Sequence, residues 1–166
     1  MSEHRRLFFA LLPEPDALAG LVAILDGLSR LRGRPVRPPN LHLTLAFIGA
    51  ADAGMIACLR DRAAAVRAAP FELSLDRLGH FPRSGVLWLG SSEPQPALLD
   101  LVAALNVALS PCGYEPERRP YAPHVTLMRK LGRRPRLATP RPVSWRAREF
   151  VLMESIPEPG GVSYRS

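Results

Sequence analysis

The chain is poor in lysine, in cysteine and in long hydrophobic runs. Lys130 is the only lysine among 22 basic residues. Two cysteines, Cys58 and Cys112, are too few for a disulfide framework, so we expect both to be reduced and structural. No apolar run approaches the roughly 18 residues that a membrane helix needs. The short N-terminal apolar stretch leads into Pro13 and acidic residues instead of a cleavage site. These absences predict a cytoplasmic protein with no membrane anchor.

The length fits one ordinary domain, or two small lobes that share a core. The chain has 166 residues, and 47% of them are hydrophobic, so a real interior can form. We expect residues 1–166 to make a single bilobal domain and the protein to be a monomer.

The positive charge is concentrated in two segments. The formal net charge is +7, and residues 118–148 contain ten basic side chains and no acidic one. Residues 30–37 contain four more arginines and again no acid. A charge run is often only a solvated surface, and a preference for arginine over lysine can reflect genome composition. Because each run adjoins one of the histidine motifs described below, we instead expect an anionic substrate.

Hydrophobic periodicity predicts alternating strands and helices in two similar halves. The strands are expected at 6–12, 41–49, 71–78, 85–90, 124–128 and 143–153, and the helices at 15–30, 52–68 and 95–109. Each half has one strand with a His-x-Thr motif, which suggests an ancient duplication. We therefore expect an α+β fold of duplicated β-α-β units, with antiparallel sheets and pseudo-two-fold symmetry.

The motifs occupy residues 42–45 and 124–127. Along a strand, residues i and i+2 share a face, so His42 and Thr44 should point away from Leu41, Leu43, Leu45 and Phe47. His124 and Thr126 repeat the pattern. A lone strand histidine is more often structural. The chain has only three threonines and four histidines, and two of three threonines would follow a histidine in this way in roughly one of 600 shuffled sequences.

Two histidines and two hydroxyls suit phosphodiester chemistry. One neutral imidazole can accept a proton from water while the other, protonated, donates to the leaving oxygen. Threonine hydroxyls and an arginine can bind the phosphate oxygens. No cysteine, aspartate or glutamate lies at ligand spacing from either histidine, so we expect neither a metal nor another cofactor.

Three segments carry a family resemblance: GRPVRPPNLHLTLAFIG (33–49), RSGVLWLG (83–90) and RPYAPHVTLMRK (119–130). They resemble the signature segments of the RNA 2′,3′-cyclic phosphodiesterases, formerly called 2′-5′ RNA ligases, within the 2H phosphoesterases. The resemblance implies a bilobal fold with the motif strands facing each other across an active cleft, RNA with a 2′,3′-cyclic phosphate end as substrate, and a 2′-phosphate product, with reversible 2′-5′ ligation as a further activity. It implies that His42 donates a proton to the leaving 3′-oxygen and that His124 activates water. Thr44, Thr126 and Arg129 would bind the phosphate.

Some features depart from that pattern or leave alternatives open. Strict alternation places Arg129 on the face opposite His124, and the chain ends at Ser166 where the family commonly continues through a longer strand. Tyr121 and Phe9 are candidates for base stacking. The chain could instead act on small cyclic nucleotides or 2′-5′ linkages, or be a non-catalytic RNA-binding module. Intact threonines in both motifs favour an enzyme.

Overall fold

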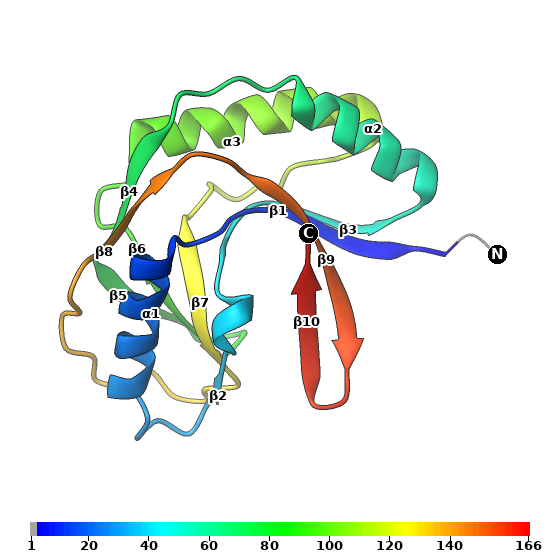
Figure 1. Ribbon diagram of the computed structural model, residues 1–166. Coiled ribbons are helices and arrows are strands. Elements are labelled where there is room, and N and C mark those ends of the chain that lie inside the picture. The colour runs from blue at the N-terminus through cyan, green and yellow to red at the C-terminus, as the bar shows by residue number, and fades with distance from the viewer. Residues whose placement is uncertain (1–2) are drawn as a thin grey trace.

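The chain folds into an α+β structure with three helices and two antiparallel sheets, which the computed structural model describes over residues 3–166 (Figure 1). The strands are β1 (Arg5–Leu11), β2 (Arg34–Pro35), β3 (Leu43–Ala51), β4 (Phe71–Leu75), β5 (Arg77–Phe81), β6 (Val86–Gly90), β7 (His124–Arg129), β8 (Val143–Ala147), β9 (Val151–Glu158) and β10 (Gly161–Arg165). The helices are α1 (Pro15–Gly27), α2 (Ala53–Ala64) and α3 (Pro96–Leu109), with 3₁₀ turns η1 (Pro38–Asn40) and η2 (Ser110–Cys112). The predicted fold class is confirmed.

The two motif strands lie at the centre of the larger sheet. Its strand order is β10-β9-β1-β3-β7-β6-β5, with β2 also paired to β7. β3 and β7 are antiparallel and are joined by one residue pair, Leu43 with Val125. Reading outward from this pair, each motif strand is followed by further antiparallel strands, β1 and β9 on one side and β6 and β5 on the other. The arrangement has the expected pseudo-two-fold character.

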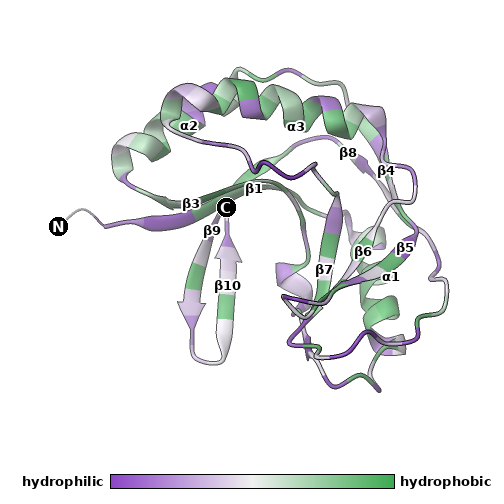
Figure 2. Ribbon diagram, turned by 180° about the vertical axis from the view of Figure 1, so that it is seen from behind, coloured by the Kyte–Doolittle hydropathy of each residue, from purple (hydrophilic) through white to green (hydrophobic). Residues whose placement is uncertain are grey.

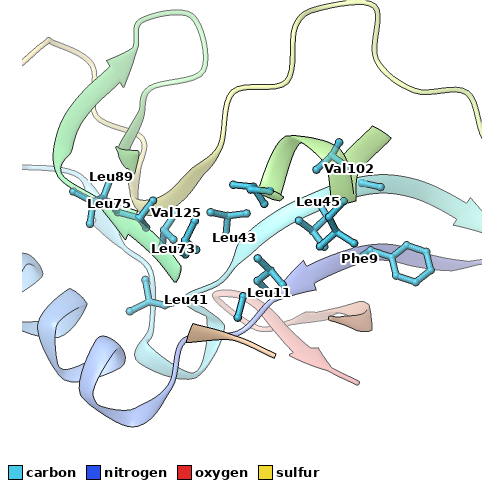
Figure 3. Packing of buried hydrophobic residues seen from close by; sticks show 14 of the residues in the cluster. Phe9, Leu11, Leu41, Leu43, Leu45, Leu73, Leu75, Leu89, Val102 and Val125 are labelled. Atoms are coloured by element: carbon cyan, nitrogen blue, oxygen red, sulfur yellow. The ribbon is translucent and has the colours of Figure 1, made fainter. Parts of the chain in front are cut away.

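One hydrophobic cluster contains residues from both halves of the sheet. Leu43, Leu45 and Val125 pack there among side chains from the other strands and from α3 (Figure 3). Helices α2 and α3 pack side by side over β3 (Figure 1), and α3 is hydrophobic along most of its length, with few hydrophilic residues (Figure 2). Its buried residues recur at helical spacing, which fixes the helix on the sheet. The shared core holds β3 and β7 in a fixed relation.

The residues at which the helices begin were predicted well from the local sequence. Pro15 and Pro96 stand in the first turns of α1 and α3, where proline is tolerated. The side chain of Asp52 caps α2 by accepting a hydrogen bond from the backbone N–H of Met55 at 2.8 Å. The helix ends were predicted too far along: α1 ends at Gly27 and α2 at Ala64.

Two predicted strands each proved to be two strands, and the C-terminal strand was not predicted. The segment 71–78 divides into β4 and β5, which lie in different sheets, and 143–153 divides into β8 and β9. Asp76 stands at the first corner and accepts hydrogen bonds from the backbone and side chain of Ser92. Period-two alternation continues through such corners, so the pattern alone does not reveal them. Residues 161–165, for which no strand was predicted, form β10, which pairs with β9.

The prediction of reduced cysteines was also wrong. Cys58 on α2 and Cys112 in η2 form a disulfide, with their Cα atoms 5.7 Å apart. They are 54 positions apart in sequence, so only the packing of α2 against the end of α3 brings them together. Across residues 3–166, no helix is long and apolar enough to cross a membrane.

Candidate active site

The pairing of β3 with β7 brings the two motifs side by side. Because Leu43 pairs with Val125 in an antiparallel register, His42 lies toward Thr126 and Thr44 lies toward His124. Leu43 and Val125 are fully buried, whereas the two histidines and the two threonines are half-buried. The alternation predicted for residues 41–45 and 124–127 is therefore confirmed, and it presents four polar groups on one surface.

A β-bulge follows the threonine of each motif. On β3, Thr44 and Ala46 pair with successive residues of β1, so Leu45 between them has no partner. On β7, Thr126 and Met128 pair with successive residues of β6 in the same way. An extra residue in one strand reverses the side-chain alternation beyond it. The two halves thus share the bulge as well as the motif.

The bulges correct two expectations about side-chain direction. Phe47 was expected to pack inward, but its side chain is 51% exposed. Arg129 was expected opposite His124, but it lies beyond the bulge, and its positive charge helps to lower the pKa of both His42 and His124. The bulges therefore turn Phe47 and Arg129 toward the surface that the motifs share.

Each imidazole is oriented by a backbone carbonyl two residues earlier. Nδ1 of His42 lies 2.7 Å from the carbonyl oxygen of Asn40, and Nδ1 of His124 lies 2.8 Å from that of Ala122. A carbonyl oxygen only accepts hydrogen bonds, so Nδ1 carries the hydrogen in both rings. Nε2 is then the atom available for proton transfer, and in His42 it lies 3.1 Å from the hydroxyl of Thr44.

Aromatic rings enclose both histidines. Phe8 stacks on His42 with ring centroids 4.7 Å apart, and Tyr164 meets the same ring edge-on at 5.1 Å. Phe81 and Trp88 flank His124 at 5.3 and 6.2 Å. Burial is the largest cause that lowers the pKa of each histidine, while the carbonyl hydrogen bonds raise it. Both imidazoles are therefore shifted toward the neutral form.

Sequence reasoning missed most of this aromatic enclosure. Phe9, the predicted stacking residue, is only 2% exposed and belongs to the core, so that prediction was wrong. Its neighbour Phe8 points to the opposite face and reaches His42. Tyr164 belongs to β10, which had no strand signal. Tyr121 donates a hydrogen bond to the carbonyl of Thr44 at 2.7 Å, and burial raises its pKa. Its role in base stacking stays a prediction.

Two hollows open beside the motifs. The first, of about 470 Å³, we call the basic groove, and it lies between β2, η1 and the β9–β10 hairpin. Its polar lining includes Arg34, Arg37, Asn40, Arg129 and Tyr164. The second, of about 380 Å³, we call the aromatic hollow, and it lies between β3, α3 and the segment that precedes β7. Its lining includes Thr44, Phe47, Phe81, Asn106, Tyr121 and His124.

The two arginine runs only partly gather at the site. Arg34 and Arg37 from the first run reach the basic groove together with Arg129 from the second. Elsewhere Arg146 and Arg148 lie 3.6 and 3.7 Å from surface glutamates, so their charge is already paired.

Within residues 3–166, no three histidine, cysteine or acidic side chains are placed to hold a metal ion. The groups that do converge are two imidazoles, two hydroxyls and an arginine, which can bind a phosphate and exchange protons with it.

Comparisons with known proteins show which family the chain resembles. The model of the 2′-5′ RNA ligase superfamily matches residues 14–156. The RNA 2′,3′-cyclic phosphodiesterase of Escherichia coli (strain K12) is 38% identical over 130 residues, which cover 78% of this chain and 74% of that protein. The Archaeoglobus fulgidus protein of the same name is 30% identical over 171 residues and 96% of both chains.

Solved structures are similar over nearly the whole chain. E. coli LigT complexed with 3′-AMP superposes with a TM-score of 0.91 at 33% identity, covering 98% of this chain and 95% of that one. A Thermus thermophilus protein, TT0787, gives a TM-score of 0.79 at 28% identity, over 96% of this chain and 93% of its own.

Proposed function

The chain belongs to the 2′-5′ RNA ligase superfamily, and on that premise we propose that it hydrolyses 2′,3′-cyclic phosphate ends of RNA to 2′-phosphates without a metal. The observation that carries this proposal is the antiparallel pairing of the two His-x-Thr motifs around Leu43 and Val125. It supplies two imidazoles from opposite directions to one position. The curated relatives at 30 to 38% identity are named RNA 2′,3′-cyclic phosphodiesterase, which supports the same substrate.

In the proposed reaction each histidine has one role. Nε2 of His124 takes a proton from water as the water oxygen bonds to phosphorus. The bond from phosphorus to the 3′-oxygen breaks, and Nε2 of His42 gives that oxygen a proton. The phosphate then stays on the 2′-oxygen. Carbonyl hydrogen bonds at both Nδ1 atoms support these roles, since they leave Nε2 as the ring nitrogen available for proton transfer.

The remaining groups of the site act on the phosphate charge. The hydroxyls of Thr44 and Thr126 donate to the non-bridging oxygens, and Arg129 neutralises the charge that develops there. Burial lowers the pKa of His42, yet this residue must be protonated to act as the acid. A bound phosphodiester anion raises that pKa again, so substrate binding itself charges His42.

RNA is the substrate that best fits the surface around the site. Arg34 extends the positive charge from Arg129 along the basic groove, where the phosphates upstream of the cyclic end would lie, whereas Arg37 is paired there with Glu158 at 3.1 Å. A small cyclic nucleotide would use none of this groove. With RNA as the substrate, we also propose that the protein is cytoplasmic. We propose separately that residues 1–166 form a single bilobal domain and that the protein is a monomer.

One assay tests the proposal. An oligoribonucleotide ending in a 2′,3′-cyclic phosphate is incubated with the protein in EDTA, and the terminal phosphate of the product is located by ³¹P NMR. We expect full turnover and a 2′-phosphate, because two imidazoles and an arginine provide what a metal would otherwise supply. A 3′-phosphate, or activity that EDTA abolishes and Mn²⁺ or Zn²⁺ restores, contradicts it. Turnover of a cyclic mononucleotide but not of the RNA would favour the small-molecule alternative.

A further inference from the structure

One amide side chain lies buried beside the site. Asn40 is 8% exposed, and among residues 3–166 no histidine, charged residue or other amide side chain is buried to that degree. It is the last residue of turn η1 and stands two positions before His42. A buried amide lowers the stability of a fold unless its polar atoms form hydrogen bonds. The hydrogen bonds of Asn40 therefore indicate what this side chain does.

Asn40 binds two parts of the molecule at once. Its side-chain Nδ2 donates a hydrogen bond to the carbonyl oxygen of Val162 on β10 at 2.9 Å. Its backbone carbonyl accepts the hydrogen bond from Nδ1 of His42 at 2.7 Å. Figure 1 shows the turn η1 (cyan) beside β10. One residue thus connects the C-terminal hairpin to the imidazole that acts as the acid in the proposed reaction.

The strand that Asn40 binds places an aromatic ring against His42. Val162 and Tyr164 stand two residues apart on β10, and the ring of Tyr164 meets that of His42 edge-on, with centroids 5.1 Å apart. Within residues 3–166, β10 pairs with no strand other than β9. Beyond β9, its attachment to the rest of the protein therefore depends on side-chain contacts.

A second donor reaches the same carbonyl but is exposed. Nη2 of Arg37 lies 2.8 Å from the carbonyl oxygen of Val162 and 3.1 Å from Glu158, and the Arg37 side chain is 61% exposed. Water competes with such an exposed contact, which then contributes little to stability. The hydrogen bond from Asn40 is better shielded, and a low local dielectric strengthens it. Of the two donors, we expect Asn40 to hold β10 in place.

The groups that face His42 come from several elements. Burial is the largest cause that lowers the pKa of His42, and the charges of Arg129 and His124 on β7 lower it further. Phe8 on β1 stacks on the ring and carries no charge. Tyr164 is the titratable group that β10 contributes. If Tyr164 moved away, water would reach the imidazole and the pKa would rise toward its ordinary 6.5.

We propose that the side-chain amide of Asn40 is a positioning group for His42, which binds β10 to turn η1 and so holds the imidazole between the Asn40 carbonyl and the Tyr164 ring. The proposal rests on the hydrolytic function only in giving His42 the role of the acid. Asn40 itself touches no reacting atom. By fixing the ring, it keeps Nε2 of His42 where that atom can protonate the leaving 3′-oxygen.

NMR titration of His42 tests this role without any substrate. The full-length protein, with isotope-labelled histidine, is titrated as the wild type and as the variants Asn40→Ala, Asn40→Leu and Arg37→Gln. Both Asn40 variants should raise the pKa of His42 toward 6.5, because each removes the donor to Val162 while the backbone carbonyl remains. Asn40→Leu keeps the volume of the side chain, so it separates the hydrogen bond from packing. Arg37→Gln removes the exposed donor and should leave this pKa unchanged.

A double variant shows whether Asn40 acts through Tyr164. Asn40→Ala combined with Tyr164→Ala should give the same pKa of His42 as Tyr164→Ala alone, because the ring that the amide holds is already absent. The maximum of kcat/KM should move to higher pH in Asn40→Ala. In the wild-type protein, the side-chain NH₂ hydrogens of Asn40 should exchange slowly with solvent, a measurement that does not depend on the folding of any variant.

Each other outcome overturns the role. A wild-type pKa in Asn40→Leu would mean that the side chain only fills space, and shifts that add in the double variant would mean that it does not act through Tyr164. A shift in Arg37→Gln as large as that in Asn40→Ala would assign the attachment of β10 to Arg37. Fast exchange of the Asn40 NH₂ hydrogens would refute the hydrogen bond itself. Failure of the hydrolytic function is seen separately, as no hydrolysis or as a 3′-phosphate product alongside the expected pKa shifts.

Discussion

Each histidine of the site has a partner that does not itself react. The carbonyls of Asn40 and Ala122 fix which ring nitrogen faces the cleft, so an alanine substitution removes a proton-transfer group while the strand that carries it remains. His42→Ala and His124→Ala should each lower kcat on cyclic-ended RNA by at least about 10²-fold. The double variant should be little worse than either one, because the residues act as a unit. Steady-state kinetics on variants with native circular dichroism would measure this, and near-normal turnover by either single variant would refute the acid/base assignment.

The pKa shifts of the histidines predict where the pH optimum lies. One histidine must be neutral and the other protonated, so kcat/KM rises through one pKa, falls through the other and is greatest midway between them. Burial lowers both pKa values below the ordinary 6.5. The maximum of kcat/KM should therefore lie below pH 6.5.

The kcat profile should lie at higher pH than that of kcat/KM. It reports the enzyme with substrate bound, and the bound phosphodiester anion favours the protonated imidazoles, so both pKa values rise. Stopped assays between pH 4.5 and 9 would give both profiles. A flat profile, or a kcat/KM maximum above pH 7.5, would be inconsistent with these two half-buried imidazoles as acid and base.

Single residues of the site could be predicted where a residue type that suits the chemistry is also rare in the chain. The two motifs stood out because threonine is scarce in this chain and two of its three threonines follow a histidine at the same spacing. The neighbours Phe8 and Phe9 were not distinguishable, because an apolar run gives no alternation to say which one faces the core. The structure resolves this through the register of β1 with β3 and β9, which buries Phe9 in the main core and turns Phe8 toward His42.

At the scale of elements, the pairing of β3 and β7 with their neighbours explains why alternation predicted the direction of some side chains correctly and of others wrongly. Alternation correctly placed His42 and Thr44 away from the core. It failed for Phe47 and Arg129, because a bulge at Leu45 and another at Leu127 each insert one residue. A leucine in a bulge looks like any other strand leucine, so its presence depends on pairing with β1 or β6 and leaves no local signal.

The C-terminal strand is an element of the site that the sequence alone did not show. β10 pairs with β9, and Arg165 and Arg5 both bind Glu154, which lowers the pKa of that carboxyl to about 2. These contacts place Tyr164 edge-on against His42. Removing the ring exposes the imidazole to water, and burial is the main cause that lowers its pKa.

Tyr164→Ala should therefore raise the pKa of His42 and move the maximum of kcat/KM to higher pH. Tyr164→Phe keeps the ring and is the matched control, so its profile should follow the wild type. The measurement is the kcat/KM profile over the same pH range for all three proteins. An unmoved profile in Tyr164→Ala, or an equal displacement in Tyr164→Phe, would show that the ring does not control the titration of His42.

At the scale of the whole molecule, the disulfide joins segments that are distant in sequence. Cys58 and Cys112 close a loop over a separation of 54 positions, between α2 and the turn that leads toward the second motif. Cross-linking a loop of this length stabilises a fold by about 2–4 kcal/mol, chiefly by restricting the unfolded chain.

Reduction should lower the free energy of unfolding by about 2–4 kcal/mol. Urea denaturation with and without dithiothreitol would measure the difference. The double variant Cys58→Ser, Cys112→Ser should match the reduced protein and should not respond to the reductant. Identical unfolding midpoints for the wild-type protein in both conditions, with the thiols shown to be free after reduction, would mean that the bond contributes nothing to stability.

The net charge of +7 should act on long RNA through the segment that follows β7. Arg133, Arg134 and Arg136 are exposed there, and the side chain of Arg30 binds the carbonyl of Arg136, which links the two arginine runs. Each phosphate contact to a single strand contributes about −0.7 to the slope of log affinity against log salt. Replacing the three arginines with glutamine should therefore raise KM for long RNA and reduce that slope by up to about 2.

A cyclic mononucleotide has no upstream phosphates, so its kinetics should be unchanged in the triple variant. Arg62→Gln removes one positive charge at an exposed position in the last turn of α2, away from this segment. It is the control for loss of a surface charge and should leave the salt slope unchanged. The KM and kcat of both substrates would be measured between 50 and 300 mM salt. If the triple variant lowers kcat equally for the RNA and the mononucleotide, these arginines support the fold or the chemistry, and the positive surface does not act by binding the RNA chain.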